Sequence, residues 1–312
     1  MNIQYPTKIL VQRRSAIGDV IMSTAVVREL NHRYGDNAVI DIATDCFEVY
    51  RNNPRVRNII PTDSADPKAY DIYVNLDDAY ELNPKNHYID SYLFRAFGHN
   101  DVSRQVELFP SKEDHEVIEQ DIKNIGHRYI VIHMRNWHWA AKNITMETWF
   151  AVFEKLFTRR TDFRIVTVGG ATDHTVDHPL FFDARDRYNC QQQKLLCDRA
   201  ACFVGIDSGP FHCAAASDTY IVGLLTHLDP ECIMPQRHLD DAWSWTAITT
   251  QEDCRGCNKE QARPVRQLVC KKGTTPCNNN FDTDAITQAI LKDRKSTRLN
   301  SSHTDISRMP SS

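Results

Sequence analysis

The strongest constraint on the fold is a repeated alternation of short apolar strands with helices. The pattern begins with an apolar strand at residues 8–11, followed by a turn, a helix at residues 20–33 and a second strand at residues 38–43. A strand–helix–strand unit joins parallel strands, because the helix carries the chain back along one face of the sheet. The first part of the chain is therefore predicted to hold a parallel sheet covered by helices.

The same alternation continues along the chain. Further strands are predicted at residues 58–61, 71–76, 129–133, 163–168, 202–206 and 220–225. Further helices are predicted at residues 47–52, 88–97, 112–124, 146–159, 191–200, 210–216 and 285–291. Two consecutive arrays of this kind predict an α/β protein with two Rossmann-like domains, whose parallel sheets face each other across a cleft.

The predicted domain organisation follows from these two arrays. A chain of 312 residues is long enough for two cores. We expect a first domain over residues 1–126 and a second over residues 127–292, the latter including a cysteine-rich segment at 254–277. Residues 293–312 are polar and serine-rich without periodicity, and they resemble translated vector sequence. They are predicted to be a disordered tail outside the fold.

Charge and hydropathy exclude several classes of protein. The formal net charge of −4 does not provide the basic field of a nucleic-acid binder. The sequence has no apolar run near the roughly 18 residues needed to span a bilayer. Its N-terminus is polar and leads directly into a strand, unlike a secretory signal. These features predict a cytoplasmic protein.

The first motif that indicates chemistry is Ser15-Ala-Ile-Gly-Asp19, between a predicted strand and a helix. Gly18 permits a tight turn, and Asp19 falls at the start of the helix with its carboxylate directed at the expected cleft. Aspartate is also a favoured cap at a helix N-terminus. Spacing alone therefore leaves two interpretations of Asp19, a helix cap and a catalytic carboxylate.

The second motif, Asp-Ser-Gly-Pro-Phe-His, follows the predicted strand at residues 202–206. A helix that opens here would direct backbone N–H groups at its ligand, and such an end attracts phosphate. The same residues also make a good generic turn. The candidate binding residues in this motif are Asp207, Ser208, Gly209, Pro210 and His212.

Taken together, the two motifs resemble those of the heptosyltransferases of glycosyltransferase family 9. The resemblance runs from about Lys8 to Ile290 and is strongest over residues 8–60 and 202–231, where Asp-Pro-Glu at 229–231 also fits. The resemblance implies the GT-B fold, with the donor nucleotide on the C-terminal domain and the acceptor on the N-terminal domain.

The resemblance also implies roles for individual residues. Asp19 matches the general base that removes the proton of the acceptor hydroxyl during an inverting displacement. The leaving nucleoside diphosphate would be stabilised without a metal, by the helix start at Ser208 and Gly209 and by Lys142. Lys142 matches the lysine that precedes a Glu-x-Trp helix start in the family.

The remaining donor-site assignments follow from the same resemblance. Asp207 and His212 are expected on phosphate or sugar hydroxyls, and Gly18 is grouped with the binding residues. Two consecutive glycines, Gly169 and Gly170, would lie beside the base or ribose, although any tight turn could use such a pair. His-Met-Arg-Asn at 133–136 replaces a His-Pro-Gly-type loop, with Arg135 as the substitute phosphate ligand.

The predicted function is that of an inverting, metal-independent glycosyltransferase. It would move heptose from an ADP-linked donor to a lipopolysaccharide-type or other glycan or glycolipid acceptor, as a monomer that is cytoplasmic or peripheral on the inner membrane. Two alternatives remain open. One is another GT-B activity, a sugar-nucleotide epimerase or a phage or capsule glycan transferase. The other is a catalytically silent nucleotide-sugar-binding protein.

Four of the ten cysteines form a separate cluster, Cys254, Cys257, Cys270 and Cys277. Four thiolates from one segment can hold a tetrahedral zinc ion, and some family members have a cysteine-rich segment before the last helix. Reduced thiols and a disulfide-tied loop are the competing interpretations. The cluster is therefore a candidate structural zinc site, and no metal is assigned to catalysis.

Overall fold

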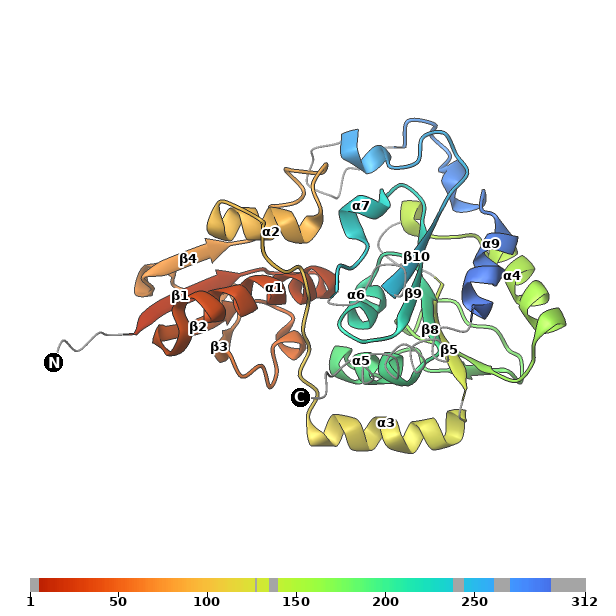
Figure 1. Ribbon diagram of the computed structural model, residues 1–312, viewed down its shortest axis with the longest axis horizontal. Helices are drawn as coiled ribbons and strands as arrows, with labels where there is room; N and C mark the ends of the chain where they lie inside the picture. Colours follow the sequence, from red (N-terminus) through yellow and green to blue (C-terminus); the bar gives the residue numbers. More distant parts are fainter. Residues whose placement is uncertain (1–5, 127, 135–139, 238–243, 261–269, 293–312) are drawn as a thin grey trace, which may run out of the picture.

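The computed structural model describes residues 6–126, 128–134, 140–237, 244–260 and 270–292. Two parallel sheets organise the molecule (Figure 1). The first has the strand order β3-β2-β1-β4, with β1 at Thr7–Gln12, β2 at Ala38–Ala43, β3 at Val56–Ile60 and β4 at Ile72–Asn75. The second has the order β10-β9-β8-β5-β6-β7.

The strands of the second sheet are β5 at Tyr129–His133, β6 at Arg164–Thr167, β7 at Phe181–Asp183, β8 at Cys202–Gly205, β9 at Tyr220–Leu225 and β10 at Trp245–Thr249. All of their pairings are parallel. In both sheets the strand order reverses next to the first strand, between β1 and β4 and between β5 and β8. Doubly wound sheets bind ligands beyond the carboxyl ends of the strands at such reversals.

Helices cover the sheets and join the two halves. They are α1 at Ile17–Tyr34, α2 at Tyr88–Phe97, α3 at Lys112–Ile125, α4 at Met146–Arg159, α5 at Cys190–Arg199, α6 at Gly209–Ala215, α7 at Pro230–Ile233 and α9 at Thr283–Leu291. Helix α1 packs on α2 within the first half and on α6 of the second. Helices α4 and α9 pack together at the opposite side of the six-stranded sheet from α6 (Figure 1).

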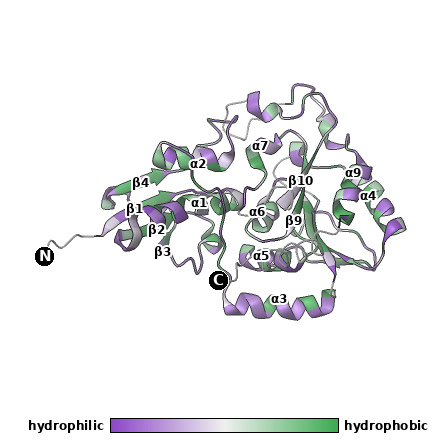
Figure 2. Ribbon diagram, in the orientation of Figure 1, coloured by the Kyte–Doolittle hydropathy of each residue, from purple (hydrophilic) through white to green (hydrophobic). Residues whose placement is uncertain are grey.

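One hydrophobic core runs through both halves. It includes Ile9 and Val26 of the first half together with Phe203 and Phe211 of the second. A second core, which contains Trp149, lies between the six-stranded sheet, α4 and α9. The strands are correspondingly apolar, whereas α3 is largely hydrophilic (Figure 2). The shared core means that the halves are held together by apolar burial as well as by the connecting chain.

Most predicted elements are confirmed, and β2, β5, β9, α2 and α4 have the predicted bounds. The sequence missed β7, α7 and β10, which are short. The helix predicted at 47–52 is wrong, because the chain forms only a 3₁₀ turn at Phe47–Val49 before Asn52 adopts a left-handed φ of 63° and Pro54 follows.

The division into domains at residue 126 stays a prediction. Helix α3, which that division assigns to the first domain, packs on α5 of the second half. Within the described part of the chain, no helix has both the length and the apolar character that crossing a bilayer requires.

Two glycines allow the first turns of α1 and α6 to meet. A Cβ atom on Gly18 would lie 2.5 Å from Cδ2 of His212, and one on Gly209 would lie 2.6 Å from Cγ2 of Ile17. Neither distance is compatible with a side chain, so each glycine admits a residue of the opposite half. The structure thus explains both glycines by close packing between the halves.

We predict that Gly18→Ala lowers the free energy of unfolding by about 1–3 kcal/mol, because the added methyl group overlaps the His212 ring. Chemical denaturation measures the change. Gly170→Ala is the matched control, since the nearest atom to its added methyl group, Oδ2 of Asp173, is 3.9 Å away. Equal stabilities of the Gly18 variant and the wild type would contradict the packing argument.

Candidate functional site

The carboxyl ends of β1 and β8 both lead to the contact between the halves. The chain leaves β1 at Gln12 and enters α1 at Ile17, and it leaves β8 at Gly205 and enters α6 at Gly209. These two turns hold the two motifs that the sequence singled out. Because Gly18 lies against His212, the motifs meet in one place as expected.

Asp19 is both a helix cap and a member of a charged network. Its Oδ2 atom accepts a hydrogen bond from the backbone N–H of Ala16 at 3.0 Å, which confirms the cap interpretation. The same atom lies 3.0 Å from Nη2 of Arg13, and the hydroxyl of Tyr80 donates to Oδ1 at 2.9 Å. The side chain keeps 17% of its surface exposed, so it remains reachable from solvent.

Arg13 is the buried cation of this network. Only 5% of its side chain is exposed, and its Nη2 lies 2.9 Å from Oε1 of Glu81. Its Nη1 donates to the carbonyl of Leu76 at 3.3 Å and lies 3.8 Å from Oδ1 of Asp77. Burial raises the pKa of Glu81 above its ordinary value, although Arg13 opposes the shift.

Asp207 is the buried anion on the other side of the contact. Its carboxylate binds the amino group of Lys142 and lies 3.1 Å from Nε2 of His212. Burial would raise its pKa, but Lys142 and His212 together hold that pKa well below its ordinary value. The ionised carboxylate is therefore surrounded by groups that favour its charge.

The turn that carries Lys142, a 3₁₀ turn at Ala140–Lys142, is anchored by the end of β9. The hydroxyl of Thr226 donates to the carbonyl of Ala141 at 2.6 Å, and Nδ1 of His227 lies 3.3 Å from the same oxygen. Burial and, to a smaller extent, the nearby Lys142 ammonium lower the pKa of His227 to about 4. A neutral His227 therefore supports this turn at neutral pH.

Ser208 belongs to a chain of buried polar groups. Its hydroxyl lies 2.9 Å from Nδ1 of His133, whose Nε2 is 3.1 Å from Oδ2 of Asp173. That oxygen also accepts the backbone N–H of Gly170 at 2.8 Å. Gly169, with φ at +133°, leaves no room for a Cβ beside Asp173 and His133, whereas a Cβ on Gly170 would fit. Packing thus accounts for Gly169 alone, and the nucleotide contacts of both glycines stay a prediction.

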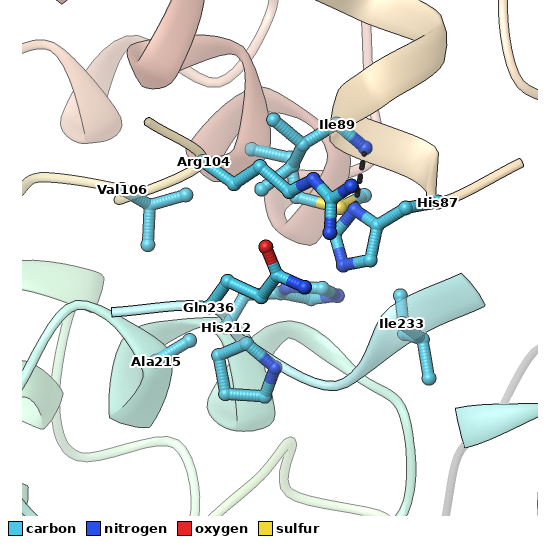
Figure 3. Close-up of a pocket in the computed structure, with 10 residues that line it drawn as sticks. His87, Ile89, Arg104, Val106, His212, Ala215, Ile233 and Gln236 are labelled. Carbon is cyan, nitrogen blue, oxygen red and sulfur yellow. Dashed lines mark hydrogen bonds between the residues drawn. The ribbon is translucent and has the colours of Figure 1, made fainter. Parts of the chain in front are cut away.

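A pocket lies in the seam between the halves (Figure 3). His87 and Arg104 of the first half face Gln236 and His212 of the second. Asp90 pairs with the Arg104 guanidinium, with Nη2 at 2.6 Å from Oδ2, and burial lowers the pKa of His87 to about 4. The pocket is therefore lined by paired or neutral groups, and His212 borders both it and Asp207.

Several functional candidates were missed by sequence reasoning. Arg13 directly follows β1, and Thr226 and His227 directly follow β9. Attention to the residues just beyond each strand would have found these three. Tyr80 and Glu81 lie in an irregular loop after β4, where no sequence pattern marks them. Pro210 occupies the first turn of α6 as predicted.

Two other sets of predicted residues have different outcomes. Arg135 lies outside the described residues, so its phosphate contact stays a prediction. The four clustered cysteines are unpaired thiols. Among the described residues, the one triad of potential ligand atoms that converges is Glu252, Asp253 and Cys254, where Lys272 pairs with both carboxylates. The structure does not bring the sulfur atoms of the four cysteines together as the predicted zinc site requires.

Comparison with known families decides the class of protein. The family described as glycosyltransferase family 9 (heptosyltransferase) matches residues 72–263, which is more than half of the chain. The chain belongs to glycosyltransferase family 9. It is accordingly a glycosyltransferase. A search of curated proteins found no significant match.

Solved structures support the fold of this family 9 glycosyltransferase. A family 9 enzyme from Veillonella parvula superposes with a TM-score of 0.68 at 15% identity, over 95% of this chain and 99% of that one. For Escherichia coli ADP-heptose lipopolysaccharide heptosyltransferase II the TM-score is 0.62 at 18% identity, over 80% and 92%.

A third relative is TibC of enterotoxigenic Escherichia coli, described as an iron-containing dodecameric glycosyltransferase. It superposes with a TM-score of 0.70 at 13% identity, over 95% of this chain and 78% of that one. TibC has also been solved in complex with ADP-D-β-D-heptose. At these identities the likenesses establish the fold, and the predicted GT-B architecture is confirmed.

We predict that Asp207→Asn lowers the free energy of unfolding of this family 9 glycosyltransferase by about 3–5 kcal/mol at pH 7, because Lys142 and His212 lose their shared anion. Denaturant titration measures the loss. The pKa of Asp207 is depressed in the folded state, so its stabilisation is present above the unfolded pKa of about 3.9 and declines as the pH falls below it.

The matched control is Asp198→Asn, which breaks a partly exposed pair with Lys194 one helical turn away. That change is expected to cost at most about 1 kcal/mol. Similar losses in the two variants would contradict a special role for the Asp207 cluster.

Proposed function

We propose that this family 9 glycosyltransferase transfers heptose from ADP-heptose to a glycan or glycolipid acceptor of the lipopolysaccharide type. The proposal rests on one observation above all: Asp19 and the Lys142–Asp207–His212 cluster meet where α1 contacts α6. Support comes from the structural similarity to Escherichia coli ADP-heptose lipopolysaccharide heptosyltransferase II and to TibC, which has been solved in complex with ADP-D-β-D-heptose. The proposal places the acceptor on the half that ends at residue 126 and the donor on the half that follows.

In the proposed reaction Asp19 is the general base. The acceptor hydroxyl oxygen attacks the anomeric carbon, and its proton passes to the Asp19 carboxylate as the new C–O bond forms. The bond from the anomeric carbon to the diphosphate breaks, and its electron pair leaves with ADP. One displacement from the opposite face inverts the anomeric configuration and needs no covalent intermediate.

The diphosphate would be stabilised by the Lys142 ammonium and by the His212 ring, both of which Asp207 holds in place. Asp207 is itself an ionised carboxylate, which makes it unsuited to contact phosphate directly. It orients Lys142, whose side chain is 18% exposed, and His212. Fixed positive groups at the point where charge develops lower the barrier most when they need no reorganisation. We assign donor contacts to Lys142, His212 and the backbone at Ser208 and Gly209.

We predict that Asp19→Asn reduces transfer by at least about a hundredfold, because an amide cannot accept the hydroxyl proton. Calorimetric binding of ADP should change less than about threefold, since Asp19 lies on the acceptor side of the contact. Asp63→Asn is the control, because it removes an exposed carboxylate that pairs with the neighbouring Arg14. Full activity of the Asp19 variant would reduce Asp19 to a helix cap and contradict the mechanism.

The cysteine cluster fits a structural metal by its chemistry. Burial raises the pKa of Cys277 to about 11, and the thiols of Cys254, Cys270 and Cys257 contribute to that shift. The four sulfur atoms do not converge on one point in the structure, so a bound metal would have to draw them together. Soft thiolates suit zinc or iron, and TibC is described as iron-containing. A metal held by these four residues would fix the fold of their segment.

The segment supports the donor half directly. The backbone N–H of Asn258 donates to the carbonyl of His227 at 3.2 Å, and its side chain accepts the backbone N–H of Asp229 at 3.1 Å. Lys259 lies 3.0 Å from Oδ2 of Asp229. The part of the cysteine segment at Asn258 and Lys259 is therefore joined to the loop after β9, which anchors Lys142.

We predict that purified protein contains about one equivalent of zinc or iron, and that Cys257→Ser loses it, because a four-thiolate site needs every ligand. Elemental analysis measures the metal, and ADP calorimetry measures the weaker donor binding that should accompany its loss. Cys46→Ser is the control, a partly buried thiol outside the cluster. Protein without metal, or with metal that survives Cys257→Ser, would remove the proposal.

A further inference from the structure

Arg13 holds two carboxylates with one nitrogen. Nη2 lies 3.0 Å from Oδ2 of Asp19 and 2.9 Å from Oε1 of Glu81. The exposed fractions differ, at 17% for the Asp19 side chain and 6% for that of Glu81. The guanidinium therefore joins Asp19, which solvent reaches, to Glu81, which is buried.

Glu81 is buried and only partly satisfied by hydrogen bonds. Its Oε2 atom has no hydrogen-bond partner among the described residues, and neither does Nε of Arg13. Aromatic rings surround the pair, with the Arg13 guanidinium carbon 5.4 Å from the ring centre of Tyr80 and 5.6 Å from that of Tyr92. Burying a carboxylate with an unsatisfied oxygen lowers the stability of the folded state, so stability alone does not explain this ion pair.

The surroundings of Asp19 include titratable groups from each element packed against it. Arg13 comes from the turn after β1, and Cys46 comes from the loop after β2. The loop after β4 contributes Tyr80 and Glu81, and α2 contributes Tyr88 and Tyr92. His212 faces the same turn across Gly18, and Asp77 approaches Arg13. Arg13 is the cation nearest to Asp19 in this set, and Glu81 is the carboxylate that shares it.

We propose that Arg13 is a positioning residue for Asp19 and that Glu81 sets how strongly Arg13 acts on it. The inference rests on the proposed function, in which Asp19 accepts the acceptor's proton. Arg13 and the Tyr80 hydroxyl fix the two carboxylate oxygens in one orientation. Glu81 shares the same guanidinium nitrogen, so the attraction of Arg13 is divided between the two carboxylates. No atom of Arg13 or Glu81 joins the reacting bonds.

Two nearly isosteric substitutions test this division of charge in opposite directions. In Glu81→Gln the negative charge of Glu81 is lost while Arg13 and its contact with Asp77 remain, so Asp19 becomes harder to protonate. The acidic limb of the kcat profile then moves down by about half to one pH unit. In Tyr80→Phe, Asp19 loses a donor and becomes easier to protonate, so the same limb moves up by a similar amount.

Each substitution has a matched control in the same half of the molecule. Glu107→Gln removes a carboxylate that pairs with Arg55 at 2.7 Å. Tyr70→Phe removes a hydroxyl that donates to Asp41 at 2.7 Å. Both controls should leave the limb within about 0.2 pH units, because neither pair contacts Asp19.

Arg13→Lys tests the positioning role by a different readout. Lysine keeps the charge but lacks the planar fork, so kcat should fall about tenfold to a hundredfold while the donor KM stays within about twofold. Limb shifts in the same direction for Glu81→Gln and Tyr80→Phe, or no shift in either, would overturn the inference. If Arg13→Lys does not fold, the two nearly isosteric variants still decide it.

The experiment separates this inference from the proposed function. A wild type without heptosyl transfer, or an Asp19→Asn variant with full activity, refutes the function. The wild type can instead be active and Asp19→Asn inactive while the pH profiles of Glu81→Gln and Tyr80→Phe stay unshifted. That result refutes only the role of Arg13 and Glu81.

Discussion

The first turns of α1 and α6 meet with no space for a methyl group between them. Gly18 accepts the ring of His212, and Gly209 accepts the side chain of Ile17. Each turn is also the exit from a strand next to the reversal in its sheet, β1 in one half and β8 in the other. The close contact therefore brings together the two positions where doubly wound sheets bind ligands, and it fixes them relative to each other through a core that both halves share.

Around this contact the two halves carry opposite arrangements of charge. In the first half a buried cation, Arg13, lies between the carboxylates of Asp19 and Glu81. In the second half a buried anion, Asp207, lies between Lys142 and His212. Burying such charged clusters costs solvation free energy, and the clusters contribute little net stability. Their effect is on the electrostatic potential at the contact between the halves. The two carboxylates of the first half suit removal of a proton from the acceptor. Lys142 and His212 of the second half suit binding of a departing diphosphate.

Sequence patterns predicted the architecture because helices and strands recur with clear periods and the two motifs fall at strand ends. Short elements such as β7 and β10 escaped, since three to five residues give too little pattern. Asp19, Asp207 and His212 were found because their motifs are local in the chain. Glu81 was not, because its contact with Arg13 spans 68 positions and lies in a loop without a pattern. Tertiary contacts of that kind are decided by the packing of α2 and the β4 loop.

The most direct test of the account is a crystal structure of the protein with ADP bound. We expect a diphosphate that contacts the Lys142 amino group and the backbone at Ser208 and Gly209, with Asp19 facing it across the contact of α1 and α6. A diphosphate bound away from Lys142, or on the first half beyond β1 and β4, would contradict the assignment of donor and acceptor sides.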